Sequence, residues 1–298
     1  MPRITSVGHW NSAAGYEDYR AKYDVAMRDL PAATTVRDIR TDYGVVRVYA
    51  YAGANGGLDP LVLLPGTSSG TPVWADNLKS LLAITDVYAI DLLGEPGMSV
   101  QNRPITSDED KAAWLDQTLA ALPEQRFNLL GMSIGGWTAM NLAVRRPGRI
   151  ATVTTLDPVN VYDRIPAQTV LRSLPAAVKW LPRSWRDSFN SYTAGGRPVE
   201  QVPVADMIES GMKNYTMHQP QPGRITEQQL SSLPMPVLAI IAGRSVMHRP
   251  ETARSTAERA LRTKTVAYYP DASHAINGEY PDRIANDLRA FLTIRDRS

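Results

Sequence analysis

The sequence predicts an α/β fold in which a doubly wound, mainly parallel sheet carries helices on both faces. Four short apolar runs are bounded by turn residues and are typical of strands buried on both faces: 60–64, 87–90, 127–130 and 237–241. Helical patterns separate these runs, and strands that alternate with helices form a mainly parallel sheet. A long interruption of this rhythm, at residues 158–232, predicts an inserted helical cap.

The N-terminal part is predicted to form a helix and then a pair of strands. Apolar and aromatic residues recur at helical spacing over residues 11–29 and stop before Pro31, which predicts a helix packed on the outside of the domain. Residues 36–51 then alternate like two strands joined by a turn.

The remaining core elements follow from the same periodicities. Ser107, with Asp110 three residues later, has the spacing of a capping box at the start of a helix. Helical patterns cover residues 74–82, 107–122, 135–146 and 281–291, and strand patterns cover residues 151–156 and 265–270. We therefore divide the chain into a core, residues 1–157 and 233–298, and a cap, residues 158–232.

Composition excludes several classes of function. The 32 Lys and Arg residues nearly balance the 30 Asp and Glu residues, so the formal charge of +2 predicts no nucleic-acid partner and no anionic membrane partner. The absence of cysteine excludes disulfides, thiolate metal sites and a cysteine nucleophile. No apolar run has the length of a signal peptide or a membrane span, which predicts a cytoplasmic protein.

The strongest chemical signal is a Gly-x-Ser-x-Gly motif at residues 131–135, which places Ser133 between a predicted strand and a predicted helix. Glycines permit the sharp turn that exposes a serine hydroxyl at the end of a sheet. This context favours Ser133 as a nucleophile. The alternative is a serine that only caps the helix.

Two other loops could complete a site around Ser133. The small residues after the first core strand could direct backbone N–H groups at an oxyanion, and we assign the amides of Thr67 and Ile134 to that role. The alternative for this loop is a simple turn. His274 follows the last predicted strand and could accept the serine proton, whereas structural or surface roles are predicted for His9, His218 and His248.

With these motifs in order, the chain resembles the α/β-hydrolase superfamily from about residue 34 onward, and most closely its bacterial carboxylesterases. Many members have His-Gly where this chain has Pro65 and Gly66, which leaves the backbone donors available. The usual acid position holds Ser245, which cannot balance an imidazolium charge. The resemblance implies a second possible position, after the strand that follows the nucleophile helix, where Asp157 lies. An Asp-Pro turn is the alternative.

The predicted function is that of a serine hydrolase, most readily a carboxylesterase, that needs no cofactor and no metal. Two alternatives stay open from sequence, a cyclase or lyase of the same fold and a ligand-binding pseudoenzyme. Aromatic residues of the cap predict a small-molecule substrate with an apolar or aromatic part: Trp180, Trp185, Phe189 and Tyr215. They could equally pack the cap onto the core. The oligomeric state is not predicted.

Overall fold

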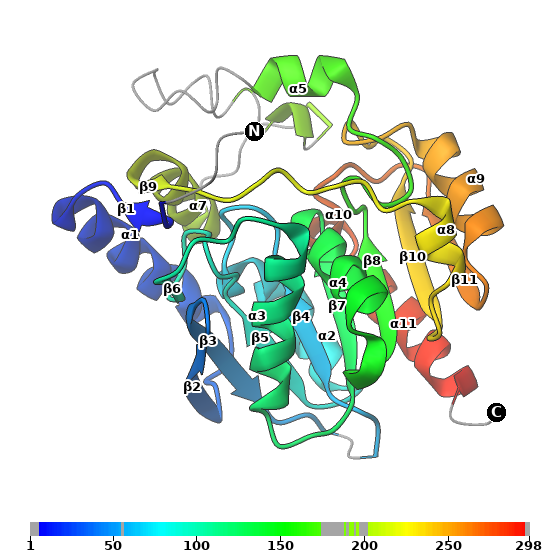
Figure 1. Ribbon diagram of the computed structural model, residues 1–298, viewed down its shortest axis with the longest axis horizontal. Coiled ribbons are helices and arrows are strands. Elements are labelled where there is room, and N and C mark those ends of the chain that lie inside the picture. Colours follow the sequence, from blue (N-terminus) through cyan, green and yellow to red (C-terminus); the bar gives the residue numbers. More distant parts are fainter. Residues whose placement is uncertain are drawn as a thin grey trace.

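In the computed structural model, a sheet of nine strands crosses the middle of the part of the chain that the structure describes (Figure 1). This part comprises residues 6–54, 57–173, 188, 191–193, 195–196 and 202–295. Six neighbouring strands run parallel, and the strand pair near the N-terminus adds antiparallel neighbours at one edge. The prediction of a doubly wound, mainly parallel sheet is confirmed.

The strand order β11-β10-β8-β7-β4-β5-β3-β2, with β6 paired to β3, puts the strand before Ser133 near the centre. The bounds are β2 Thr35–Thr41, β3 Gly44–Tyr51, β4 Leu61–Leu64, β5 Val87–Ile90, β6 Val100–Gln101, β7 Phe127–Met132, β8 Ile150–Leu156, β10 Val237–Ala242 and β11 Lys264–Tyr269. Every residue of β4, β5, β7, β8 and β10 is buried, as expected for strands covered on both faces.

Helices cover the sheet in two layers, each with its own apolar cluster. One layer contains α3 Asp108–Ala120, α4 Ile134–Arg145, α8 Glu227–Ser231 and α9 Pro250–Ala260. The other contains α1 Ala13–Ala26, α2 Ala75–Leu82, α10 Ile276–Glu279 and α11 Pro281–Arg295. Short 3-10 helices lie at Met27–Asp29, Thr71–Trp74 and Pro147–Arg149. The capping box predicted for Ser107 and Asp110 is present at the start of α3.

The N-terminal helix is less peripheral than its sequence predicts. Tyr19 and Tyr23 of α1 are fully buried: Tyr23 donates to the core residue Asp91 at 2.9 Å, and helix α7 Pro203–Asn214 of the insertion packs against α1. Just before α1, strand β1 His9–Trp10 pairs antiparallel with strand β9 Tyr215–Thr216. The N-terminal segment therefore holds the insertion against the core. The paired residues lie about two hundred positions apart in the sequence, so no local sequence pattern predicts this contact.

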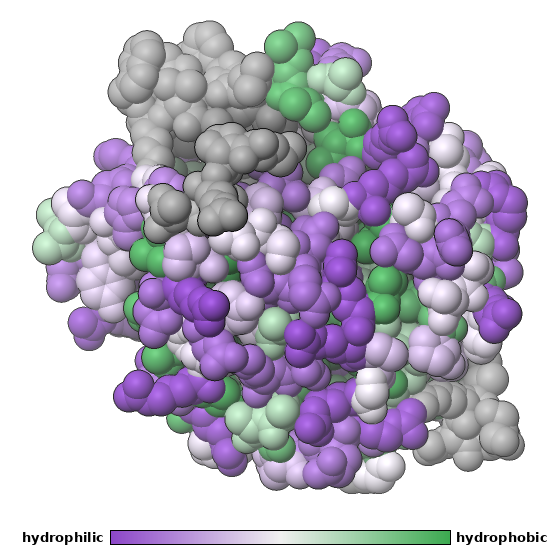
Figure 2. Space-filling view, viewed as in Figure 1, coloured by the Kyte–Doolittle hydropathy of each residue, from purple (hydrophilic) through white to green (hydrophobic). Residues whose placement is uncertain are grey.

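The described part of residues 158–232 contains α5 Ala167–Ser173, α7, β9 and α8; α5 lies above the upper edge of the sheet in Figure 1, whereas α8 packs against α9 at the side. Figure 2 shows that hydrophilic residues dominate this view of the surface, while apolar residues gather over α5, where Val170 and Leu171 are exposed. Along the described residues, none of the helices has the length and apolarity that a bilayer span requires.

Candidate active site

Ser133 occupies the sharp turn between β7 and α4, at the carboxyl edge of the sheet. Its φ of 52° lies in the left-handed region that non-glycine residues rarely adopt. The turn is tight on its inner side, since a Cβ atom on Gly135 would lie 2.0 Å from the carbonyl oxygen of Leu64. Ser133 is nearly buried, and its N–H donates to the carbonyl of Leu156 at 3.0 Å.

His274 reaches Ser133 from the loop after β11. Its Nε2 atom lies 2.9 Å from Oγ of Ser133, so a neutral imidazole can accept the hydroxyl proton. Two contacts hold the loop: Ser273 donates through N–H and Oγ to Glu279 at 2.7 and 2.8 Å, and the N–H of His274 donates to the carbonyl of Thr193 at 3.2 Å. The second contact ties the loop to the insertion.

Asp157 lies directly after β8 and faces the other nitrogen of His274. The distance between its Oδ2 and Nδ1 of His274 is 2.6 Å, and its side chain is fully buried. A carboxylate only accepts hydrogen bonds, so Nδ1 carries the hydrogen and Nε2 of the neutral ring is left to accept from Ser133. The structure thus brings the three predicted residues into one continuous chain of contacts.

Three further donors surround the Asp157 carboxylate. Oδ1 accepts from the N–H of Ala242 at 3.0 Å and lies 2.7 Å from Nε2 of His248, while Oδ2 accepts from Oγ of Ser245 at 2.6 Å. Burial raises the pKa of the Asp157 carboxyl, but the charge and hydrogen bond of His248, together with the hydrogen bond of His274, hold that pKa well below its usual range.

The sequence predicts a structural or surface role for His248 and a Ser245 hydroxyl able to hydrogen-bond a histidine, whereas Ser245 in fact donates to Asp157. In the structure, His248 is 2% exposed and in contact with Asp157. Burial lowers the pKa of His248, but the nearby Asp157 charge outweighs burial and raises it. The position of both residues in the sequence could have indicated a place beside the acid. They lie in the loop after β10, where members of the superfamily usually carry their acid.

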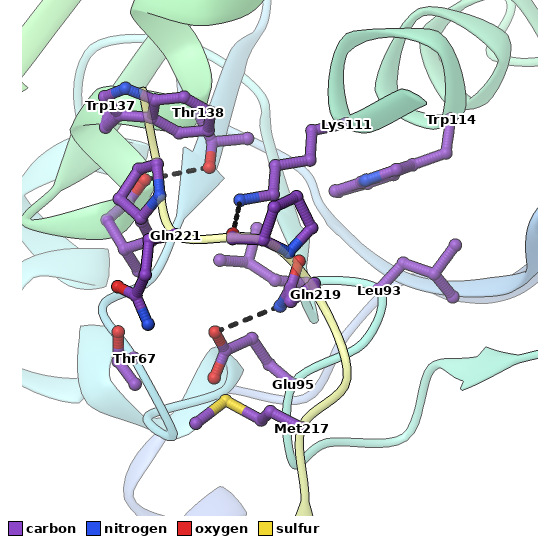
Figure 3. A pocket seen from close by; sticks show the side chains of 14 residues that line it. Thr67, Leu93, Glu95, Lys111, Trp114, Trp137, Thr138, Met217, Gln219 and Gln221 are labelled. Atoms are coloured by element: carbon purple, nitrogen blue, oxygen red, sulfur yellow. Dashed lines mark hydrogen bonds between the residues drawn. The ribbon is translucent and has the colours of Figure 1, made fainter. Parts of the chain in front are cut away.

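A cavity of about 270 Å³ is lined in part by Ile134, the residue after Ser133, while Ser133, His274 and Asp157 are not among its lining residues (Figure 3). Thr67 and Ile134, the predicted oxyanion residues, are part of its wall. Their amide N–H groups donate no hydrogen bond to another described residue, and at Ile134 this reflects the free N–H groups of a helix N-terminus. Apolar side chains form much of the remaining wall: Leu92, Leu93, Trp114, Trp137, Met217, Pro220 and Pro222.

Two buried charged residues also line the cavity, and both hold loops in place. Glu95 accepts from the N–H of Ser68 at 3.1 Å and from Gln219 at 3.4 Å, and burial raises its pKa to about 7. Lys111 donates to the carbonyl of Pro220 at 2.6 Å and lies 4.8 Å from the centre of the Trp137 ring. Burial lowers the pKa of Lys111. Sequence reasoning missed both residues.

Of the four aromatic residues predicted to shape the pocket, the structure describes only Tyr215. Tyr215 packs on Trp10, with ring centroids 5.0 Å apart, and therefore helps to fasten the insertion to the N-terminal segment. Trp180, Trp185 and Phe189 lie outside the described residues. Among the described residues, no group of three His, Cys, Asp or Glu side chains is arranged to hold a metal ion.

Known proteins share this architecture over almost the whole chain. Carboxylesterase YbfK of Bacillus subtilis is 21% identical over 290 residues, which cover 94% of each protein. The crystal structure of naproxen esterase from Bacillus subtilis superposes with a TM-score of 0.85 at 20% identity, over 94% of this chain and 99% of that one. The crystal structure of carboxylesterase CesB (YbfK) from the same organism gives a TM-score of 0.85 at 18% identity, with the same coverage.

The order of motifs in the sequence predicts membership of one superfamily, and a family model tests that prediction directly. The model of the alpha/beta hydrolase family matches residues 61–287, which include the cavity wall and all the groups around Ser133 described above. This chain therefore belongs to the alpha/beta hydrolase family and is a hydrolase.

Proposed function

We propose that this hydrolase cleaves carboxylic esters, with Ser133 as nucleophile, His274 as general base and Asp157 as the acid that supports the base. The observation that carries the proposal is the chain of contacts from Ser133 Oγ to His274 at 2.9 Å and from His274 to Asp157 at 2.6 Å. A serine hydroxyl becomes a useful nucleophile when a neighbouring base takes its proton and a third group orients that base.

The proposed reaction has two halves. In the first, Ser133 Oγ attacks the ester carbonyl carbon while its proton passes to Nε2 of His274, and the N–H groups of Thr67 and Ile134 donate to the oxyanion. His274 then gives the proton to the leaving alcohol, and an acyl group remains on Ser133. In the second half, His274 activates a water molecule, which releases the carboxylic acid and restores the hydroxyl of Ser133.

The proposed substrate is a small ester with an apolar or aromatic part. The cavity of about 270 Å³ lies at the small end of ligand pockets and presents the rings of Trp114 and Trp137. Residues 217–222 of the insertion form one of its walls. We propose that the segment 158–232 is a cap that shapes this pocket, while residues 1–157 and 233–298 form the core. The known proteins that it resembles include carboxylesterases and a naproxen esterase, which fits this choice.

A covalent probe tests the proposal. We expect a fluorophosphonate to label Ser133 and the wild-type protein to hydrolyse p-nitrophenyl esters. Ser133→Ala should lose labelling and lower kcat by about 10³-fold or more, because a nucleophile, its base and its acid depend on one another for activity. Ser231→Ala, at a half-buried serine of α8, is the matched control and should retain both properties. Undiminished turnover in Ser133→Ala would exclude the proposed nucleophile.

A further inference from the structure

Two histidines, not one, hold the Asp157 carboxylate. His274 contacts Oδ2 and His248 contacts Oδ1, at 2.6 and 2.7 Å. We propose that His248 is a positioning residue of the catalytic centre, which acts through Asp157 and sets how much negative charge Asp157 presents to His274. This inference rests on the proposed function of Ser133, His274 and Asp157.

The geometry fixes the direction of the hydrogen bond. Since a carboxylate cannot donate, Nε2 of His248 must carry the hydrogen, whether the ring is neutral or charged. With the N–H of Ala242 and the hydroxyl of Ser245, the carboxylate accepts four hydrogen bonds, two on each oxygen. Rotation of the carboxylate would break several of them, so His248 helps to keep Oδ2 aligned with His274.

His248 is itself held in place by its neighbour. Arg249 donates to Asp163 through its backbone N–H at 3.1 Å and through Nε and Nη2 at 2.9 Å each. Asp163 lies only six residues after Asp157, in the segment that follows β8. The loop after β10 is therefore fastened to the segment after β8 on both sides of the His248 ring.

The charges around His248 raise its pKa against the effect of burial, although its buried Nδ1 has no hydrogen-bond partner among the described residues. Asp157 and Asp163 both face it, and the Arg249 guanidinium neutralises Asp163. Among the described residues, the side chains that pair ionically with Asp157 are His248 and His274. Because Asp157 is fully buried, solvent does not screen these interactions as it does at a surface.

Protonation of His248 should therefore lower the rate of the proposed reaction. A cationic His248 partly neutralises Asp157, so less negative charge remains to stabilise the imidazolium that His274 becomes in the transition state. A positive charge on His248 also opposes the positive charge that His274 gains on protonation, so loss of the His248 charge should make protonation of His274 easier. The acid limb of the pH profile of kcat/KM should then lie at higher pH.

His248→Gln is the decisive variant, because the amide nitrogen of glutamine can replace the Nε2 donor but carries no charge. We expect its acid limb to move to higher pH by about half a unit or more, with kcat at pH 9 within about threefold of wild type. His248→Leu removes the donor as well, and should lower kcat by about tenfold or more with little change in KM. His9→Gln, at an exposed histidine, is the control and should leave the profile unchanged.

NMR titration of the His274 ring in wild type and in His248→Gln gives a second readout that needs no substrate. We expect the His274 signal of His248→Gln to move to higher pH, as the acid limb does. Because this measurement needs no activity, it tests the role of His248 even if the protein lacks esterase activity. Such a lack would contradict only the proposed function. A His248→Gln protein whose His274 titrates as in wild type would overturn the inference. A fall in kcat of His248→Leu without any displacement of the acid limb would likewise assign His248 to structural support alone.

Discussion

Asp157, which contacts His274, and Glu95, which lines the cavity, are both buried carboxyls, yet their pKa values are shifted in opposite directions. Asp157 accepts four hydrogen bonds, two of them from histidines, and its pKa lies well below the usual range. Glu95 accepts one backbone N–H at 3.1 Å and one longer contact from Gln219, and burial raises its pKa to about 7.

The difference shows that burial alone does not decide the charge of a carboxyl group. Desolvation favours the neutral acid at both positions, and only the number and charge of the donors distinguish them. At Asp157 the donors make a permanent anion, which is what a partner of His274 requires. At Glu95 the donors are too few, so the cavity wall carries a group that changes charge near neutral pH.

The largest effect is expected from removing the charge of Asp157 while keeping its shape. Asp157→Asn should lower kcat by about 10³–10⁴-fold, because the amide cannot stabilise the imidazolium and can force the wrong tautomer on His274. Steady-state kinetics with p-nitrophenyl acetate would measure the loss. Asp24→Asn, at an exposed carboxylate of α1 far from these contacts in the sequence, is the control. Activity of Asp157→Asn near that of wild type would break the contrast with Glu95.

The second prediction concerns stability at Glu95. A pKa raised from 4.5 to about 7 means that ionisation of Glu95 destabilises the folded state, by about 3 kcal/mol once ionisation is complete. The stability due to the neutral acid is complete below pH 4.5 and is lost as the pH rises through 7. Glu95→Gln should therefore unfold at higher urea concentration than wild type at pH 8.5, with the gain absent at pH 5.

The exposed Glu17 provides the control for this measurement, since Glu17→Gln removes the same type of charge without burial. We expect its urea midpoint to follow that of wild type at both pH values. A gain for Glu95→Gln that is equal at pH 5 and pH 8.5 would mean that a better fit of the amide, rather than the cost of a buried charge, is responsible.

The smallest effect is expected at Ser245, one of four donors to Asp157. Its hydroxyl donates to Oδ2 at 2.6 Å and accepts from the N–H of Met247 at 3.2 Å. Ser245→Ala should lower kcat by about tenfold, which corresponds to one hydrogen bond to a charged group. The same pH profile as wild type is expected, since Ser245 carries no charge. A loss as large as that of Asp157→Asn would show that the remaining three donors cannot hold the carboxylate.

The contrast also explains what sequence reasoning could and could not predict. Ser133, His274 and Asp157 each follow a strand pattern, and the ends of parallel strands meet at one edge of the sheet, so their proximity was predictable. His248, Ser245 and Glu95 act through loop conformations that place single atoms 2.6 to 3.1 Å from a partner. No periodicity encodes such contacts.

The N-terminal contacts were equally hidden. Strands β1 and β9 have two residues each and lie about two hundred residues apart, too short and too distant for any pattern. For the same reason α1 could be predicted as a helix, but its burial by α7 could not. The core was predictable because its strands and helices carry their own periodic signal, whereas the insertion depends on its contacts with other parts of the chain.

The supports of Ser133, Asp157 and His274 differ in their attachment. Ser133 and Asp157 directly follow neighbouring strands, β7 and β8, and the N–H of Ser133 donates to the carbonyl of the residue before Asp157, so the sheet itself sets the spacing between nucleophile and acid. His274 follows β11, the edge strand two positions from β8, on a loop that bonds to Thr193 of the insertion. Of the three residues, His274 is thus the one whose loop is bonded to the insertion. A displacement of the insertion would therefore first change the distances from His274 to Ser133 and to Asp157.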